Sequence, residues 1–268
     1  MKIGVLGKIS KVKNQATIDE IVGFLRELGH DTRIFSSPTE INDVDLVVVL
    51  GGDGAILHSA VVAAKNGVKI IGINYGNLGF LTEYEKDEKE YIKDLITALE
   101  KENCRIVKRS LLACEVGDKT FYALNEVALQ RDCGSVSVKN PQILKLNVRT
   151  NEGETLVSGD GVLICTPTGS TAYSLSAGGA ILTPEVPVFM LTPICAFSMR
   201  ARPIVFSDKE EFSVLTVRGK ATLLLDGHVV ATLGEGAEIR VKKAPFTADF
   251  PAREQSGFLN KVRNKLNG

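Results

Sequence analysis

Apolar residues in the first hundred positions alternate between strand-like runs and helix-like spacing. The run Lys2–Gly7 opens the chain, and apolar residues then recur at intervals of three and four, as one buried face of a helix requires. These positions are Ile18, Ile21, Val22, Leu25 and Leu28, and Gly29 closes the helix. The segments that continue the alternation are Asp31–Phe35, Asp45–Leu50, Ala55–Lys65, Val68–Asn74 and Asp87–Glu102. Repeated strand–helix units predict an α/β fold, a doubly wound, Rossmann-like parallel sheet with a central, buried Asp45–Leu50 strand.

After about residue 102 the pattern changes to short β-like runs separated by Gly, Asn, Asp or Pro. The runs are Leu111–Val116, Phe121–Gln130, Ile143–Thr150, Gly161–Cys165, Phe212–Val217, Ala221–Leu225 and Ile239–Lys242. They predict a β-rich C-terminal domain, interrupted by one helix at Thr171–Ala177. We therefore expect an α/β domain over residues 1–101 and a β-rich domain over 102–247. Segment 248–268, with apolar residues at helical spacing near its end, should pack back on the first domain.

The composition disfavours several classes of function. The 268 residues carry 32 basic and 32 acidic side chains, with a sequence pI near 6.8, so no global positive field would hold nucleic acid or a membrane surface. No apolar stretch reaches the roughly 18 residues of a membrane span, and the first residues lack the layout of a signal peptide. We predict a cytoplasmic protein without nucleic-acid or membrane partners, whose five cysteines are small buried residues in a reducing compartment.

The turn Gly51-Gly52-Asp53-Gly54 lies where a predicted buried strand ends and a helix begins. Open α/β sheets bind ligands at such carboxyl ends, where helix N-termini direct free N–H groups into the crevice. The glycines would let a phosphate approach the backbone closely. Asp53 should then contact Mg²⁺ or an attacking hydroxyl, because a bare carboxylate repels phosphate. The alternative is that Asp53 only caps the helix and the glycines only turn the chain, and the tetrapeptide alone does not decide between the two.

A second polar segment runs from Ser158 to Gly179, interrupted by a short strand. Its part from Thr166 to Ser176 is dense in hydroxyls and glycines, which supplies short donors and acceptors suited to a sugar and phosphates. A capped helix with a glycine stop would explain Ser170 and Gly178, but not the length of the segment. A third signal is Asn125-Glu126, a polar pair at a possible bend in a strand-like stretch, for which a solvated strand face is the simpler interpretation.

Taken in this order, these segments resemble the NAD kinase family. The resemblance rests on the Gly-Gly-Asp-Gly turn, the two polar segments and the loop Gly76–Leu81, and it extends over nearly the full length through Arg202–Val205 and Asp226–His228. The turn by itself is shared with diacylglycerol-kinase-like and phosphofructokinase-like enzymes. The family implies Mg²⁺-dependent transfer of a phosphoryl group from ATP, or from polyphosphate in some members, to the 2′-hydroxyl of the adenosine ribose of NAD. It also implies a homodimer or homotetramer in which a neighbouring subunit completes the NAD pocket.

The resemblance also implies a role for individual residues. Asp53 would be the proton acceptor for the 2′-hydroxyl, and Gly51, Gly52 and Gly54 would admit phosphates, with no side chain assigned as a direct metal ligand. The residues implied to contact or line the dinucleotide site are Asn125, Glu126, Asp160, Thr171, Ala172, Tyr173, Ser174, Leu175, Ser176 and His228. Ser158 stands where many relatives carry Arg or Lys, so one cation toward the ligand phosphates is missing. His58 could approach phosphate, although a surface position is equally compatible with the sequence.

Two other functions stay open at this stage. A lipid or sugar kinase would use the Gly-Gly-Asp-Gly turn in the same way, but would not need the hydroxyl-rich run. A dinucleotide sensor would keep the pocket and perform no chemistry. The sequence leaves open the choice of phosphoryl donor, the use of NADH as acceptor and feedback by NADP.

Overall fold

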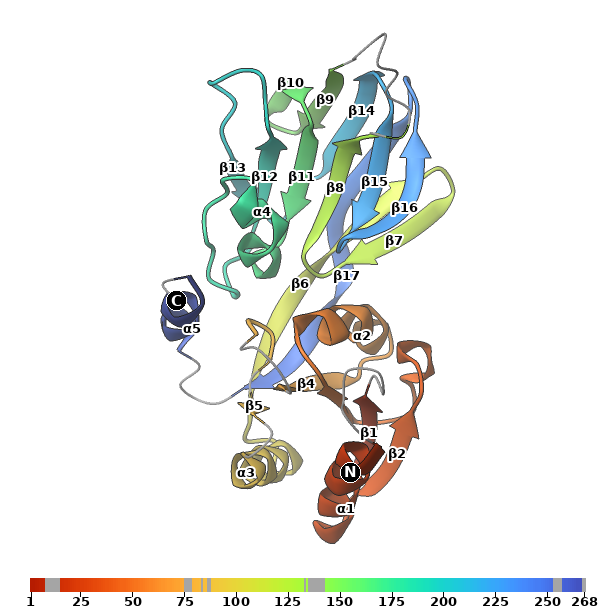
Figure 1. Ribbon diagram of the computed structural model, residues 1–268, viewed down its shortest axis with the longest axis vertical. Coiled ribbons are helices and arrows are strands. Elements are labelled where there is room, and N and C mark those ends of the chain that lie inside the picture. The colour runs from red at the N-terminus through yellow and green to blue at the C-terminus, as the bar shows by residue number, and fades with distance from the viewer. Residues whose placement is uncertain are drawn as a thin grey trace. The chain divides into compact units, whose positions relative to one another are not determined.

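The computed structural model describes residues 1–7, 15–74, 79–82, 84–85, 88–132, 134, 143–252 and 257–266. The chain divides into two compact units (Figure 1). We call Met1–Arg109 together with Phe246–Gly268 the α/β unit, and Ser110–Pro245 the β unit. The borders between them fall inside two long strands, β6 (Arg105–Val116) and β17 (Glu238–Ala252).

The α/β unit is built on a parallel sheet with the strand order β2-β1-β3-β4-β5. Its strands are β1 (Lys2–Gly7), β2 (Asp31–Phe35), β3 (Leu46–Leu50), β4 (Lys69–Asn74) and β5 (Tyr84–Glu85). Its helices are α1 (Gln15–Glu27), α2 (Asp53–Lys65), α3 (Lys89–Glu100) and α5 (Phe258–Leu266), with a 3₁₀ turn at Pro38–Glu40. The predicted parallel α/β fold is confirmed.

Both faces of this sheet are covered, which explains why β3 is an uninterrupted apolar run. Leu46, Val48 and Leu50 join the core that α1 and α3 form on one face. On the other face α2 lies so close to β4 that a Cβ at Gly72 would come 2.2 Å from Ile56 Cδ1. The connection that follows β1 crosses one face of the sheet, and the connection that follows β3 crosses the opposite face. Open α/β sheets bind ligands at the strand ends where the connections change sides in this way.

The β unit contains two six-stranded sheets, with orders β10-β9-β14-β17-β6-β7 and β13-β12-β11-β8-β15-β16. The remaining strands are β7 (Lys119–Ala123), β8 (Glu126–Arg131), β9 (Leu144–Thr150), β10 (Gly153–Gly159), β11 (Gly161–Cys165), β12 (Val188–Ile194), β13 (Ile204–Ser207), β14 (Phe212–Arg218), β15 (Ala221–Leu225) and β16 (His228–Leu233). Strands pair antiparallel within both sheets. Apolar side chains from both sheets form one core, so the predicted β-rich second part is confirmed.

The structure differs from the predicted elements in three places. The run Phe121–Gln130 is broken at Leu124-Asn125 into β7 and β8, and the helix expected at Thr171–Ala177 is a 3₁₀ turn, Thr168–Thr171, followed by the short helix α4 (Tyr173–Ser176). Strands β5, β10, β12, β13 and β16 were not predicted. Four of them, β5, β10, β13 and β16, are edge strands, which pair on one side only and therefore show little regular apolar alternation.

The cysteines are only partly buried. Cys114 and Cys165 lie in the interior and Cys104 is half-buried, but Cys195 is exposed, so the expectation of burial was wrong for this residue. Cys195 follows β12 in a turn with a left-handed backbone, φ 42°, which places it at the surface. The four described cysteines are free, and Cys133 lies outside the described residues. Among the helices of the described ranges, none has the length and hydrophobicity needed to cross a membrane.

Candidate active site

Asp53 stands at the carboxyl end of β3, as the first residue of α2. The turn that leads to it depends on glycine, because Gly51 has φ 153° and a Cβ there would come 3.0 Å from Ala55 Cβ. Gly52 occupies the N-cap position of α2 and brings no side chain to the cap. A Cβ at Gly52 or Gly54 would meet no atom of the described residues within 4 Å, and both glycines lie next to the free N–H groups of the helix start.

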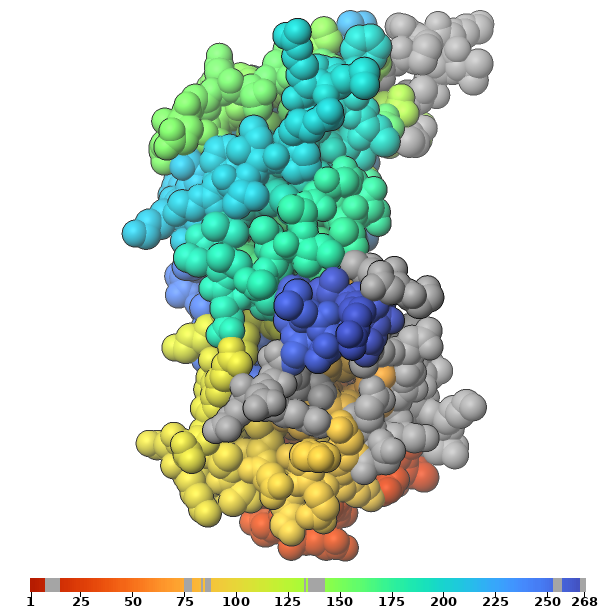
Figure 2. Space-filling model, turned by 90° about the vertical axis from the view of Figure 1, so that its left-hand side faces the viewer, coloured from red at the N-terminus to blue at the C-terminus, as the bar shows by residue number. Residues whose placement is uncertain are grey.

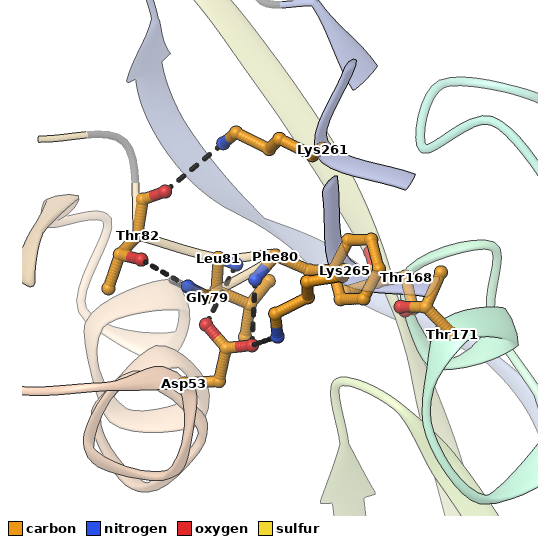
Figure 3. Close-up of polar contacts among 9 residues, drawn as sticks. All are labelled: Asp53, Gly79, Phe80, Leu81, Thr82, Thr168, Thr171, Lys261 and Lys265. Atoms are coloured by element: carbon orange, nitrogen blue, oxygen red, sulfur yellow. Dashed lines mark hydrogen bonds and ion pairs between the residues drawn. The ribbon is translucent and has the colours of Figure 1, made fainter. Parts of the chain in front are cut away.

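The carboxylate of Asp53 is held by the backbone of the segment Gly79–Thr82 (Figure 3). Its Oδ2 accepts the N–H of Phe80 at 2.8 Å and its Oδ1 accepts the N–H of Leu81 at 2.9 Å. Gly79 lies against the carboxylate, because a Cβ at this position would be 2.1 Å from Asp53 Oδ1. The alternative interpretation of the sequence was that Asp53 only caps α2. The structure instead shows that its side chain joins the start of α2 to a second loop.

The C-terminal helix α5 contributes a cation to the same group of residues. The ammonium of Lys265 lies 3.5 Å from Asp53 Oδ2, and Lys261 donates to the carbonyl of Thr82 at 3.1 Å (Figure 3). The Thr82 hydroxyl in turn accepts the N–H of Gly79 at 3.2 Å. Sequence reasoning expected the C-terminal segment to pack on the α/β part, but it assigned no role to either lysine.

Two further predictions from the sequence concern the α/β unit, His58 and the loop Gly76–Leu81. His58 lies on the exposed side of α2, five residues after Asp53. Of the loop Gly76–Leu81, residues 76–78 lie outside the described residues, while Gly79, Phe80 and Leu81 form the cradle of the Asp53 carboxylate.

In the β unit, Asn125 and Glu126 lie at the bend between β7 and β8, and both are almost completely buried. The carboxylate of Asp226 holds this bend by accepting three backbone N–H groups, from Leu124 at 2.8 Å, Asn125 at 2.7 Å and Glu126 at 3.1 Å. Asp226 itself adopts a left-handed backbone, φ 48°, as does Gly227. The Asp-Gly turn thus fixes the orientation of the Asn-Glu pair, a role that sequence reasoning did not assign to Asp226.

Glu126 is the most perturbed carboxyl group in the described part of the β unit. Burial first, and then the nearby Asp226 carboxylate, raise its pKa to about 8, although the backbone N–H of Tyr173 acts in the opposite direction. Its Oε2 is buried and has no hydrogen-bond partner among the residues that the structure describes. Burial also raises the pKa of Asp226, against the three backbone N–H donors and His228, the exposed first residue of β16. A buried, unpartnered carboxyl oxygen is a feature of a binding site for a hydrogen-bonding ligand.

The hydroxyl-rich segment divides into internal and outward residues. The Thr166 hydroxyl donates to Leu124 O at 2.6 Å, the Ser170 hydroxyl to Pro167 O at 2.7 Å, and the Ser174 hydroxyl pairs with Thr192 at 3.0 Å. These three residues are fully buried, so they hold the loop in place, and the contact that the structure gives Ser174 is internal packing rather than an open binding position. The residues with accessible surface are Thr171, Ala172, Tyr173, Leu175 and Ser176.

Tyr173 connects this segment to the sheet. Its ring packs on the small core formed by Ala128, Leu163, Cys165, Met190 and Ile194. Its hydroxyl is hydrogen-bonded to the side-chain amide of Gln130. Gly169 is pressed against the bend, since a Cβ there would lie 2.1 Å from Asn125 O. The loop and the Asn-Glu bend are therefore built as one rigid surface.

Ser158 and Asp160 lie elsewhere in the β unit. Asp160 forms an ion pair with Arg131 at 2.9 Å, and Ser158 is half-buried in β10. In the register of β8 and β11, Gly161 pairs with Gln130 and Cys165 pairs with Glu126. Four residue steps separate the two pairs, which is about 13 Å at roughly 3.3 Å per residue. Within one copy of the chain, Asp160 is therefore not brought next to Glu126.

Comparison with known proteins agrees with this geometry. The family model of the ATP-NAD kinase N-terminal domain matches residues 6–103, and that of the ATP-NAD kinase C-terminal domain matches residues 124–251. The NAD kinase of Carboxydothermus hydrogenoformans is 37% identical over 231 residues, which cover 83% of this chain and 79% of that protein. The NAD kinase of Christiangramia forsetii is 32% identical over 279 residues, covering 97% of this chain and 92% of that protein.

Solved structures give the same result at the level of the fold. The structure of an NAD kinase from Archaeoglobus fulgidus in complex with ATP has a TM-score of 0.79 at 26% identity, and the match covers 100% of this chain and 98% of that chain. Yeast NADH kinase complexed with NADH shares the fold, with a TM-score of 0.83 at 24% identity over 100% of this chain and 87% of that chain. Since both family models match and a relative is 37% identical over most of the length, the chain belongs to the NAD kinase family, a family of phosphotransferases.

Proposed function

We propose that this protein is an NAD kinase that transfers the terminal phosphoryl group of ATP to the 2′-hydroxyl of the adenosine ribose of NAD, producing NADP. Family membership supports the reaction. The observation that carries the assignment in this chain is the carboxylate of Asp53, fixed at the carboxyl end of β3 beside the free N–H groups of α2. Polyphosphate is the alternative donor that the assay below includes.

In the proposed reaction the 2′-oxygen forms a bond to the terminal phosphorus while the bond from that phosphorus to the bridging oxygen breaks, and ADP leaves. The hydroxyl proton passes to Asp53. Phosphoryl transfer requires little covalent chemistry from the protein, so accurate placement of the hydroxyl and stabilisation of charge are the main contributions. The two backbone N–H groups that hold the Asp53 carboxylate fit a positioning role.

We further propose that Mg²⁺ accompanies the triphosphate. Carboxylate oxygens are ligands that Mg²⁺ prefers, and Oδ1 of Asp53 accepts a single N–H donor, from Leu81, so this residue fits a position near such an ion. When bound, the ion would neutralise negative charge on the donor phosphates. Gly52 and Gly54, where a Cβ would meet no described atom within 4 Å, would admit the phosphates, and His58 is a further candidate contact on α2.

The β unit would bind NAD through the rigid surface around the Asn125-Glu126 bend. A ribose hydroxyl can both donate and accept a hydrogen bond, so it suits the unpartnered Oε2 of Glu126. Tyr173 offers an apolar ring beside it, and Thr171, Ala172, Leu175, Ser176 and His228 are the further proposed contacts. The two compact units are the proposed domains, close to the borders expected from the sequence.

We also propose that the working enzyme is a homodimer or homotetramer. The position of Asp160 supports this, because the Arg131–Asp160 pair lies at the opposite end of β11 from Glu126. We propose that Asp160 contacts NAD in the pocket of another copy. A cytoplasmic location stays a prediction from the sequence.

A coupled assay of NADP formation tests the function directly. The wild type and Asp53→Asn would be measured with ATP or polyphosphate, Mg²⁺ and NAD, with NAD binding followed by calorimetry. We expect Asp53→Asn to lower kcat by a factor on the order of 10³, because the amide cannot accept the proton, and to change NAD affinity by less than about threefold. A wild type that binds NAD but forms no NADP with either donor would identify a sensor and refute the proposal.

A further inference from the structure

The C-terminal helix α5 brings a lysine to the proposed catalytic carboxylate. Lys265 and Asp53 are separated by 212 positions in the sequence, and the Lys265 ammonium lies 3.5 Å from Asp53 Oδ2. Their side chains are only 27% and 29% exposed. The pair is therefore partly shielded from water, where attraction between charges is stronger than between fully exposed side chains.

Lys265 is held in place by several contacts and does not approach Asp53 as an isolated surface side chain. Residues Phe258, Lys261, Val262 and Lys265 are half-buried and follow the spacing of one helix face, while Leu259 and Arg263 are exposed. The Phe258 ring packs near the Phe80 ring, with 6.4 Å between centroids, and Lys261 bonds the Thr82 carbonyl at 3.1 Å. The Lys265 ammonium also lies 4.4 Å from the centroid of the Phe80 ring. Figure 2 shows α5, in dark blue, at the surface of the molecule.

The contact with Lys265 changes how the Asp53 carboxylate is constrained. The backbone gives each oxygen one N–H donor, Phe80 to Oδ2 and Leu81 to Oδ1. Lys265 adds a second donor to Oδ2 only. The two oxygens are therefore unequal: Oδ2 is occupied by two internal donors, and Oδ1 by one. Gly79 lies directly against Oδ1, so both oxygens are constrained and the carboxylate has one defined rotation.

We propose that Lys265 is a positioning residue for phosphoryl transfer, which fixes the rotation of the Asp53 carboxylate. This inference rests on the proposed function and makes α5 a part of the active site rather than only a structural end of the chain. Lys265 acts through Asp53, so its removal lowers turnover while leaving the binding of both substrates nearly unchanged.

The test compares Lys265→Met with Lys265→Arg and Arg263→Met in the full-length protein. Methionine keeps an unbranched side chain over Phe80 and removes the charge, arginine restores a cation, and Arg263→Met removes a cation from the exposed face of the same helix. We expect Lys265→Met to lower kcat by about 10- to 100-fold, the range of one hydrogen bond to a charged group. The KM values for NAD and ATP should change less than about threefold. Lys265→Arg should recover most of the lost kcat, and Arg263→Met should match the wild type.

Four results would overturn the inference. The first is a wild-type kcat in Lys265→Met, and the second is a raised KM for ATP at unchanged kcat, which would make Lys265 a contact of the donor. The third is a loss of kcat that Lys265→Arg does not recover, and the fourth concerns the control variant. Thermal unfolding of each variant is measured alongside, and a fall in kcat that Arg263→Met shares also refutes the role. Failure of the proposed function can be distinguished from failure of the inference on Lys265, because the wild type itself would then form no NADP.

Discussion

Gly79 should be indispensable for turnover, because the Asp53 carboxylate occupies the space where any side chain at position 79 would lie. A Cβ on Gly79 would come 2.1 Å from Asp53 Oδ1, 2.6 Å from Thr82 Oγ1 and 2.9 Å from Asp53 Cγ, whereas ordinary contact begins near 3.4 Å. In Gly79→Ala the carboxylate therefore has to move by about 1 Å or more. That movement would break or weaken the hydrogen bonds from Phe80 and Leu81.

The size of the effect follows from this displacement. A misplacement of about 1 Å in a catalytic group can lower the rate roughly 100-fold, so kcat for NADP formation should fall by about that factor. Weakening the two bonds to the carboxylate, each worth about 1.5–3 kcal/mol when fully lost, should also lower the free energy of unfolding by about 1–3 kcal/mol. The KM for NAD should change little, because the proposed NAD contacts belong to the β unit.

Steady-state kinetics and thermal unfolding of Gly79→Ala would be compared with those of Gly23→Ala. Gly23 lies inside α1, where a Cβ would meet no atom within 4 Å. The control should keep the wild-type kcat and gain up to about 1 kcal/mol in stability, as alanine does over glycine in a helix. If Gly79→Ala turned over NAD as fast as the wild type, the constraint on Asp53 would have no role in the reaction.

Two predictions concern the β unit. Asp226→Asn replaces one of the two acceptor oxygens that hold the Asn125-Glu126 bend. We expect the free energy of unfolding, measured in urea, to fall by about 1.5–3 kcal/mol and the KM for NAD to rise roughly tenfold. An unchanged urea midpoint would contradict the role of Asp226. The folded-state pKa of Glu126, about 8, lies above the ordinary value of 4.5, so the folded protein holds a proton that the unfolded chain releases. Glu126 therefore lowers stability as pH rises from about 4.5 to 8, and Glu126→Gln should flatten that part of the stability profile measured by urea unfolding.

The α/β unit could be predicted well because its signals are local. The strand Leu46–Leu50 is apolar at every position since both faces of a parallel sheet are covered, and the Gly-Gly-Asp-Gly turn follows it directly. The contacts that define the environment of Asp53 are not local: Phe80 is 27 positions away and Lys265 is 212 positions away. Periodicity predicts which residues are buried, but it contains no information on which distant partner a polar side chain meets.

The hydroxyl-rich segment shows a different limit. A serine or threonine hydroxyl can serve a ligand or the backbone of its own loop with the same chemistry, so the sequence cannot distinguish the two uses. The structure assigns Thr166, Ser170 and Ser174 to internal hydrogen bonds. Thr171 and Ser176 are left with accessible surface. The resemblance to a family pointed to the segment but did not separate residues that support the loop from residues with accessible surface.

The carboxyl groups of Asp53 and Glu126, both proposed to act in the reaction, differ in how many hydrogen bonds the protein gives them, and this difference predicts different kinetic roles. Asp53 receives two backbone N–H groups and a lysine from within its own unit, so a ligand gains little by bonding to it and its contribution should be to turnover. Glu126 has a buried Oε2 with no hydrogen-bond partner among the described residues. A buried acceptor or hydroxyl without a hydrogen bond carries a free-energy penalty, which a bound ligand removes. Its contribution should therefore be to affinity. Substitution of Asp53 should act on kcat and substitution of Glu126 on the KM for NAD, and the opposite pattern would reverse the assignment of the two groups.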